Sequence, residues 1–161
     1  MLGHRVEGRT SVVIQRAMVA LLALMLAGTA LAAVKPNTPT PMPKVKAQMK
    51  AVVDKASTEL FNVAGDADPA NGADQKLPNA AGWAKIKADA AKLRTVGDWM
   101  LVPKNGKTGE ANWVKYSKEM SALSAAASKA AAAHDAKALA QAANDLSDNC
   151  AGCHKIYKKQ T

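Results

Sequence analysis

The stretch DAKALAQAANDLSDNCAGCHKIY, residues 135–157, decides the expected fold of this chain of 161 residues. Its apolar and small side chains recur at intervals of three and four, which is the period of an amphipathic α-helix. Asp135 precedes the run and is a favourable N-cap residue. The positions that share one face of this expected helix are Leu139, Ala142, Ala143, Leu146, Cys150, Cys153 and Tyr157. That face would pack against the rest of the protein, so both cysteines are expected to point inward.

The same stretch contains the pattern Cys-x-x-Cys-His at residues 150–154, which is typical of the covalent attachment of a c-type haem. In such a site two thiols form thioethers with the two vinyl groups of one haem, and the adjacent histidine binds the iron. On a helix, Cys150 and Cys153 lie on one face, and His154 lies four residues after Cys150 on nearly the same face. About one helical turn therefore suffices to hold the cofactor and to supply its proximal ligand.

Three other interpretations of the two cysteines are open at this stage. A redox-active dithiol is typical of a β-α-β context, and no strand pattern lies nearby. A zinc site usually takes four ligands, whereas the chain has only two cysteines, and His134 and His154 do not supply a finger spacing. A disulfide across two intervening residues would be strained and would close almost no loop. Haem attachment is the interpretation that we favour.

Three further helices are expected upstream. Apolar periodicity predicts them at about residues 44–63, 83–101 and 110–133, with a loop rich in Gly, Asp and Asn at 64–82. Their expected inward-facing residues are Val45, Met49, Val52, Ala56, Leu60 and Val63, then Trp83, Ile86, Ala90, Leu93, Gly97 and Met100, then Trp113, Tyr116, Met120, Leu123, Ala127 and Ala130. The sequence therefore predicts an all-α domain of four antiparallel helices, an arrangement that is known to enclose cofactors.

The N-terminal residues have the features of an export signal. Three arginines precede an apolar run that begins at Ala17, and an Ala-x-Ala site follows at 30–32. We expect a cleaved signal peptide at residues 1–32, a flexible Pro-rich leader at 33–43 and a four-helix haem domain at 44–161. The apolar run is short for a membrane span, which takes about 20 residues. Export and covalent haem together indicate a bacterial periplasm.

The chain is basic, and its charge bears on its partners. The formal net charge is +9, and it falls to +7 when the three Arg and one Glu of the expected signal peptide are removed. A basic protein favours acidic partners. Export and the lack of interleaved basic and aromatic residues argue against nucleic acid, so we expect a redox partner protein with an acidic docking surface. We find no acid–base or nucleophile constellation, and we do not expect an enzyme.

These features resemble the cytochrome c′ superfamily, including its low-spin members with a methionine ligand. The resemblance rests on the C-terminal CAGCHKIYK stretch, the export signal and a methionine on the first helix, and it covers about residues 44–159. It implies an antiparallel four-helix bundle with one covalently bound haem c. By the same resemblance Cys150 and Cys153 would form the thioethers, and His154 would be the proximal iron ligand.

Two further roles are implied only by this resemblance. Met49 stands where the low-spin members place their sixth iron ligand, and Lys158 matches a basic residue that shapes the electrostatics of the proximal side. The chain also departs from the pattern. Many members have an arginine near a haem propionate at the position of Val45, which in this chain lies between Lys44 and Lys46.

Met49 decides between two functions. With Met49 on the iron opposite His154, both axial positions are closed, the reduction potential rises, and the protein is an electron carrier. If Met49 is instead a core residue, as methionine at helical spacing usually is, the protein binds nitric oxide or carbon monoxide in an apolar pocket formed with Val52 and Val53. We favour the electron carrier. A homodimer, and a haem-bearing subunit that docks on a larger oxidoreductase, remain open.

Overall fold

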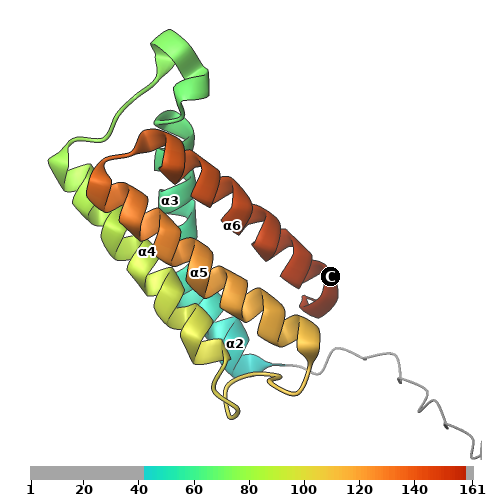
Figure 1. Ribbon diagram of the computed structural model, residues 1–161. Helices are drawn as coiled ribbons and strands as arrows, with labels where there is room; N and C mark the ends of the chain where they lie inside the picture. The colour runs from blue at the N-terminus through green and yellow to red at the C-terminus, as the bar shows by residue number, and fades with distance from the viewer. Residues whose placement is uncertain (1–41, 159–161) are drawn as a thin grey trace, which may run out of the picture. The chain divides into compact units, whose positions relative to one another are not determined.

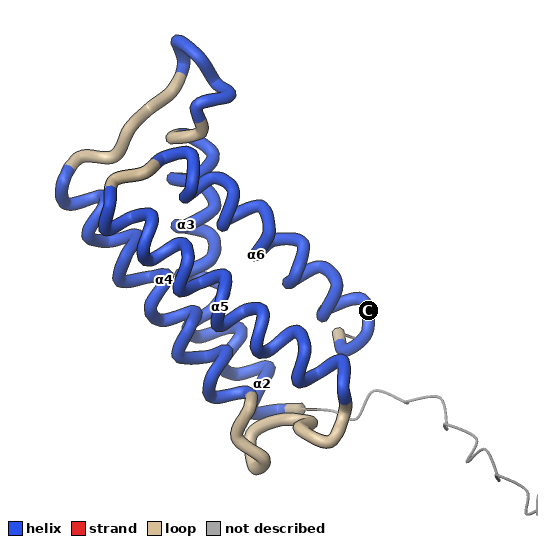
Figure 2. Tube along the Cα trace, in the orientation of Figure 1, coloured by secondary structure: helices blue, strands red, loops and turns tan. Residues whose placement is uncertain are grey.

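The computed structural model describes residues 42–158, and all regular structure within this range is helical (Figures 1 and 2). The predicted all-α class is therefore confirmed. The expected signal peptide lies outside the described residues, as do residues 33–41 of the expected leader and residues 159–161. Among the helices of residues 42–158, none combines the length and the apolarity that a membrane span requires.

The first helical stretch is continuous, but its hydrogen-bonding pattern changes twice. The helix α2 (Pro43–Gln48) leads into the π-helical turn η1 (Met49–Val53), which leads into α3 (Asp54–Asp66). Pro43 opens α2 at a position where its missing N–H has no helical partner to lose. In a π-helix each N–H bonds to the carbonyl five residues back, so the turn holds more residues than an α-helical turn.

The inward face of this stretch differs from the prediction at two positions. Val53 is buried, whereas its neighbour Val52, which we expected to face inward, is only half-buried. Ala64 is likewise buried in place of Val63. The predicted inward residues that are buried are Val45, Ala56 and Leu60. The difference at Val53 lies inside η1, where π-helical hydrogen bonds interrupt the α-helical period that the prediction assumed.

The helices α4 (Ala80–Met100) and α5 (Ala111–Ala133) share the most extensive contact in the fold. Gly97 makes this contact close, because a Cβ atom there would lie 2.9 Å from the Ser121 nitrogen and 3.1 Å from the Ser117 oxygen. The predicted inward face of α4 is confirmed, since Trp83, Ile86, Ala90, Leu93, Gly97 and Met100 are all buried.

Capping side chains set the beginnings of two helices. Asn79 accepts a hydrogen bond of 2.8 Å from the Gly82 N–H, and α4 therefore begins three residues before the predicted start. Asp135 caps α6 (Ala136–Tyr157) as predicted, with a bond of 2.9 Å from the Ala138 N–H. Such caps satisfy backbone donors that the first turn leaves without a helical partner.

The helices pack around one hydrophobic core. Helix α5 lies between α4 and α6 in sequence and contacts both, and α3 contacts α4 and α6, as Figure 1 also shows. The connection between α3 and α4 is not a simple loop, because it contains the short 3₁₀ segment η2 (Pro69–Asp74). The C-terminal turns of α6 and the start of α2 lie at the same end of the domain as the α4–α5 connection (Figure 1).

Candidate functional site

Cys150 and Cys153 lie near the end of α6 on the inward face that the sequence predicted. Both are free thiols, and both side chains are half-buried. Cys150 packs against the hydrophobic core. A group bonded to both sulfur atoms would therefore lie against the core and not in open solvent.

The surroundings of the two thiols disfavour redox chemistry. Burial raises the pKa of Cys150, and burial together with the charge of Cys150 raises the pKa of Cys153 to about 11. Redox-active dithiols have lowered thiol pKa values, often because they sit at a helix N-terminus. Here the thiols lie near the C-terminus of α6, where the helix dipole opposes a thiolate. The fold also lacks the β-α-β context of a dithiol enzyme within residues 42–158.

A zinc site finds no support in the geometry either. Within residues 42–158 there is no group of three or more His, Cys, Asp or Glu side chains arranged to hold a metal ion. His134, which the zinc interpretation would have needed, ends α5 at the opposite end of α6 from the cysteines. Its ring stacks on Trp83 with 5.2 Å between ring centroids.

His154 follows the cysteines on the same helix and is more exposed than they are, although its ring is partly desolvated. Partial burial and the nearby charge of Lys158 lower the pKa of His154, so the neutral imidazole that binds metals predominates at neutral pH. Lys158 is the residue that ends α6, and its N–H bonds to the His154 carbonyl over 2.9 Å. The positive charge of Lys158 therefore acts on the His154 ring, which lies one helical turn before it.

Met49 comes from a different part of the chain, and it begins the π-helical turn η1. Its side chain is half-buried and packs against the same core as Cys150. π-Helical turns are rare and occur frequently at functional sites. The sequence pattern did not reveal this π-helical turn.

The position of Met49 along the length of the domain can be compared with that of Cys150, starting from the last turn of α6. Met42 lines a cavity together with Lys107, and the Lys107 Nζ lies 5.7 Å from the Tyr157 ring centroid. The start of α2 is therefore level with the last turn of α6. Seven residues separate Met42 from Met49 and Tyr157 from Cys150, which is about 10 Å of helical rise in each case. Met49 consequently lies at about the level of Cys150.

Tyr116 of α5 packs directly on Gly152, one of the two residues between the cysteines. A Cβ atom on Gly152 would lie 2.9 Å from both Cε1 and Oη of Tyr116, so the ring covers this turn of α6. Asn149 Nδ2 donates a hydrogen bond of 3.1 Å to the Tyr116 carbonyl, while its buried Oδ1 has no partner among the described residues. Sequence reasoning missed Tyr116 in this role, although the glycine between the cysteines was a signal of close contact.

A second group of residues surrounds Tyr157 at the end of α6. Its ring meets Trp113 edge-on, with 5.1 Å between ring centroids. Burial and a hydrogen bond with Glu110 raise the pKa of Tyr157 to about 12. Lys107 Nζ pairs with Glu110 Oε1 at 2.8 Å, and the two side chains are only 14% and 26% exposed. These contacts join the α4–α5 connection to the last turn of α6.

Comparisons with protein-family models, curated proteins and solved structures give no match for this chain. The resemblance to the cytochrome c′ superfamily therefore rests on the sequence alone: the C-terminal motif, the export signal and the methionine on the first helix.

Proposed function

We propose that this chain is an exported c-type cytochrome of the periplasm that carries one electron through a single haem c. In this proposal four antiparallel helices form a bundle around the haem, Cys150 and Cys153 hold it by thioether bonds, and His154 and Met49 bind the iron. The observation that carries the proposal is the position of the Cys-x-x-Cys-His motif. Its two thiols lie half-buried on the inward face of α6, with raised pKa values that disfavour the alternative dithiol chemistry.

The residues present fit such a cofactor. Two sulfur atoms one turn apart face the core, the next residue offers an imidazole, and Met49 offers a thioether from a neighbouring helical segment. Bound haem would supply a ferric–ferrous couple. Desolvation and the nearby charge of Lys158 lower the pKa of His154, which favours the neutral imidazole. Tyr116 covers the Gly152 turn and limits access of water to it.

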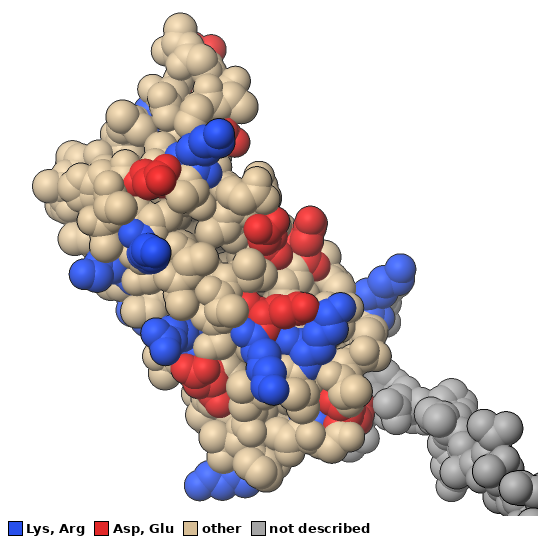
Figure 3. Space-filling view, viewed as in Figure 1, with Lys and Arg blue, Asp and Glu red and all other residues tan. Residues whose placement is uncertain are grey.

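The partner would be a redox protein with an acidic surface. This part of the proposal rests on the net charge of +7 that remains after removal of the expected signal peptide, since a basic protein attracts acidic surfaces over long range. On the face drawn in Figure 3, basic and acidic side chains alternate and do not form one large patch. Docking would then depend on the local arrangement of lysines as well as on the total charge.

A second candidate function is the binding of nitric oxide or carbon monoxide by a five-coordinate haem. The observation in its favour is the apolar character of η1, where Val53 is buried and Val52 half-buried beside Met49. If Met49 stays off the iron, these side chains would form the wall of a small apolar gas pocket. Binding of carbon monoxide by the reduced protein separates the two candidates.

The test of haem attachment is the intact mass of protein exported by a host with a haem-attachment system. We expect a mass increase of one haem that survives extraction with acidified organic solvent. Replacing both Cys150 and Cys153 by Ala should abolish it. His154→Ala should retain the covalent haem but change its spectrum, whereas His134→Ala, at the distant end of α5, should change neither. A wild-type protein without covalent haem would refute the proposal.

A further inference from the structure

The charged side chains of the domain are distributed unevenly along its length. Each helical stretch can be divided at its middle, which separates the half that holds the Cys-x-x-Cys-His motif, residues 42–54, 91–122 and 147–158, from residues 55–90 and 123–146 (Figure 1). The first half, which we call the motif end, has eleven basic and five acidic residues, a net charge of +6. The second half, the far end, has six basic and seven acidic residues, a net charge of −1. All the excess positive charge of the described domain therefore lies at the motif end.

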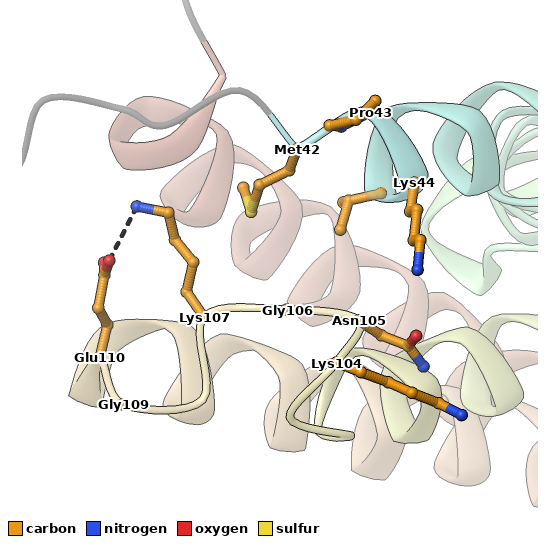
Figure 4. Close-up of a pocket in the computed structure, with 10 residues that line it drawn as sticks. Met42, Pro43, Lys44, Lys104, Asn105, Gly106, Lys107, Gly109 and Glu110 are labelled. Carbon is orange, nitrogen blue, oxygen red and sulfur yellow. Dashed lines mark hydrogen bonds and ion pairs between the residues drawn. The ribbon is translucent and has the colours of Figure 1, made fainter.

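Part of this excess surrounds a cavity of about 540 Å³ at the motif end. Lys44 lines the cavity from α2, and Lys104 and Lys107 line it from the α4–α5 connection, as Figure 4 shows. Glu110 is the one acidic residue in this lining, and its Oε1 pairs with Lys107 Nζ at 2.8 Å. Among residues 42–158, neither Lys44 nor Lys104 has a carboxylate at ion-pair distance. Their charges are therefore not neutralised by a neighbouring ion pair.

The last turn of α6 adds exposed basic and apolar side chains directly after the motif. Lys155 and Lys158 are exposed, and no carboxylate of the described part of the chain lies at ion-pair distance from either. Three large apolar side chains are exposed within residues 42–158, and two of them, Val102 at 39% and Ile156 at 37%, belong to the motif end. An apolar centre with a polar rim is the usual anatomy of a protein–protein interface.

Helix α5 extends this surface to the turn that carries the cysteines. Tyr116 is half-buried and packs on Gly152, and Ile156 lies four residues after Gly152 on the same face of α6. Lys115 is 60% exposed, its Nζ lies 5.5 Å from the Tyr116 ring centroid, and its pair with Glu119 is long at 4.0 Å. A protein seated on this surface would lie within about one helical turn of the thiols, which is about 5 Å along the helix axis.

We propose that the motif end, centred on the last turn of α6, is the surface on which a redox partner with an acidic face docks. This inference rests on the proposed function, and it adds the place and the orientation of docking. A charge excess at one end gives the domain a dipole, which turns that end toward a negative surface during approach. The far end, with its net charge of −1, is not attracted. Approach in this orientation brings the partner to the helix that carries the haem motif.

The test is the rate at which the reduced holo protein passes its electron to hexacyanoferrate(III), a trivalent anion. One electron leaves the ferrous iron, which becomes ferric, and the probe becomes hexacyanoferrate(II) with no proton transferred. Lys155→Glu should lower the second-order rate constant about tenfold at an ionic strength of about 10 mM, because the reversed charge repels an anion within about 10 Å. The loss of this cation also makes the haem a stronger reductant, which acts in the opposite direction. A slower reaction therefore reports the charge of the docking surface.

Lys137→Glu is the matched control, because Lys137 is exposed on the first turn of the same helix, about 27 Å of helical rise from Lys155. The two variants have the same net charge, yet the control should lower the rate constant by no more than about twofold. If Lys155→Glu fails to retain the haem, Lys115→Glu carries the same prediction. The difference from the control should disappear at an ionic strength of about 0.5 M, where salt screens the charges.

Equal rate constants for Lys155→Glu and Lys137→Glu, in a protein that carries covalent haem, would overturn the inference and leave the proposed function intact. Sedimentation with phosphatidylglycerol vesicles at physiological ionic strength gives a second readout. Binding by the wild-type protein that Lys155→Glu abolishes would assign the motif end to a membrane surface and would also overturn the inference. A wild-type protein without covalent haem would overturn both the inference and the proposed function.

Discussion

Replacing Gly97 by Ala should separate α4 from α5 and destabilise the protein relative to a matched glycine replacement. The new Cβ atom would lie 2.9 Å from the Ser121 nitrogen, about 0.5 Å less than the 3.4 Å at which ordinary contact begins. The three nearest atoms, from Ser117 and Ser121, all belong to the backbone of α5, so no side chain can rotate away. Overpacking of this kind costs about 1–3 kcal/mol. The higher helix propensity of alanine offsets about 1 kcal/mol of this cost. The free energy of unfolding should therefore fall by about 0–2 kcal/mol.

Gly65→Ala is the matched control, because Gly65 lies in α3 and has no atom within 4 Å of its Cβ position. This replacement gains the higher helix propensity of alanine without any steric clash. It should therefore raise the free energy of unfolding by up to about 1 kcal/mol. Urea unfolding of both variants, followed by circular dichroism at 222 nm, measures the difference, which we expect to be about 1–3 kcal/mol. Equal stabilisation by the two replacements would refute the close approach of α4 and α5.

Three further predictions concern the ligand and two titrating groups. Met49→Leu should lower the reduction potential and allow carbon monoxide to bind the reduced protein, whereas an unchanged spectrum would exclude Met49 as a ligand. Burial raises the pKa of Asp89, but hydrogen bonds from Lys92 and Lys85 outweigh it, and the pKa is lowered overall. The Asp89 carboxylate therefore stabilises the fold above its unfolded pKa of about 3.9, and this contribution is lost as pH falls through the lower folded value. Asp89→Asn should reduce the free energy of unfolding at pH 7 by up to about 1 kcal/mol, a difference that urea titrations should find vanishing in acid. The pKa of Tyr157 is raised to about 12 by burial and the hydrogen bond with Glu110. Its contribution is complete below pH 10 and lost as pH rises toward 12, so Tyr157→Phe should flatten this alkaline loss of stability; an identical pH profile would contradict it.

Much of the helical framework could be predicted from local sequence. The α4 face follows an uninterrupted α-helical period, and Asp135 is an N-cap that needs no tertiary contact to form. The first helical stretch was predicted one residue out of register within η1, where Val53 is buried in place of Val52, because nothing in the local pattern indicates the π-helical hydrogen bonds.

The α5 face was predicted only in part, for a different reason. Ser117 and Ser124 are buried there, whereas Tyr116 and Leu123, expected inward, are half-buried. Ser117 lies where Gly97 brings the backbones of α4 and α5 together, and apolar periodicity gives no weight to serine. Tertiary packing thus overrode the hydrophobic pattern.

The candidate site was likewise predictable only in part. The placement of Cys150 and Cys153 on the inward face follows from helical spacing, because both belong to one helix. The cavity joins Lys44 to Lys104 and Lys107, which lie about 60 residues further along the chain, and only the packing of α2 against the α4–α5 connection brings them together. Sequence spacing gives no information about a contact between segments that are so far apart in the chain.

The most direct test of the proposed cytochrome is the optical spectrum of the purified exported protein, oxidised and reduced, with and without carbon monoxide. We expect a covalent haem with a sharp low-spin α-band in the reduced state, which carbon monoxide leaves unmoved because His154 and Met49 close both axial positions. A broad high-spin spectrum that shifts with carbon monoxide would contradict ligation by Met49 and favour gas binding. A protein without any haem spectrum would contradict the assignment of Cys150, Cys153 and His154 altogether.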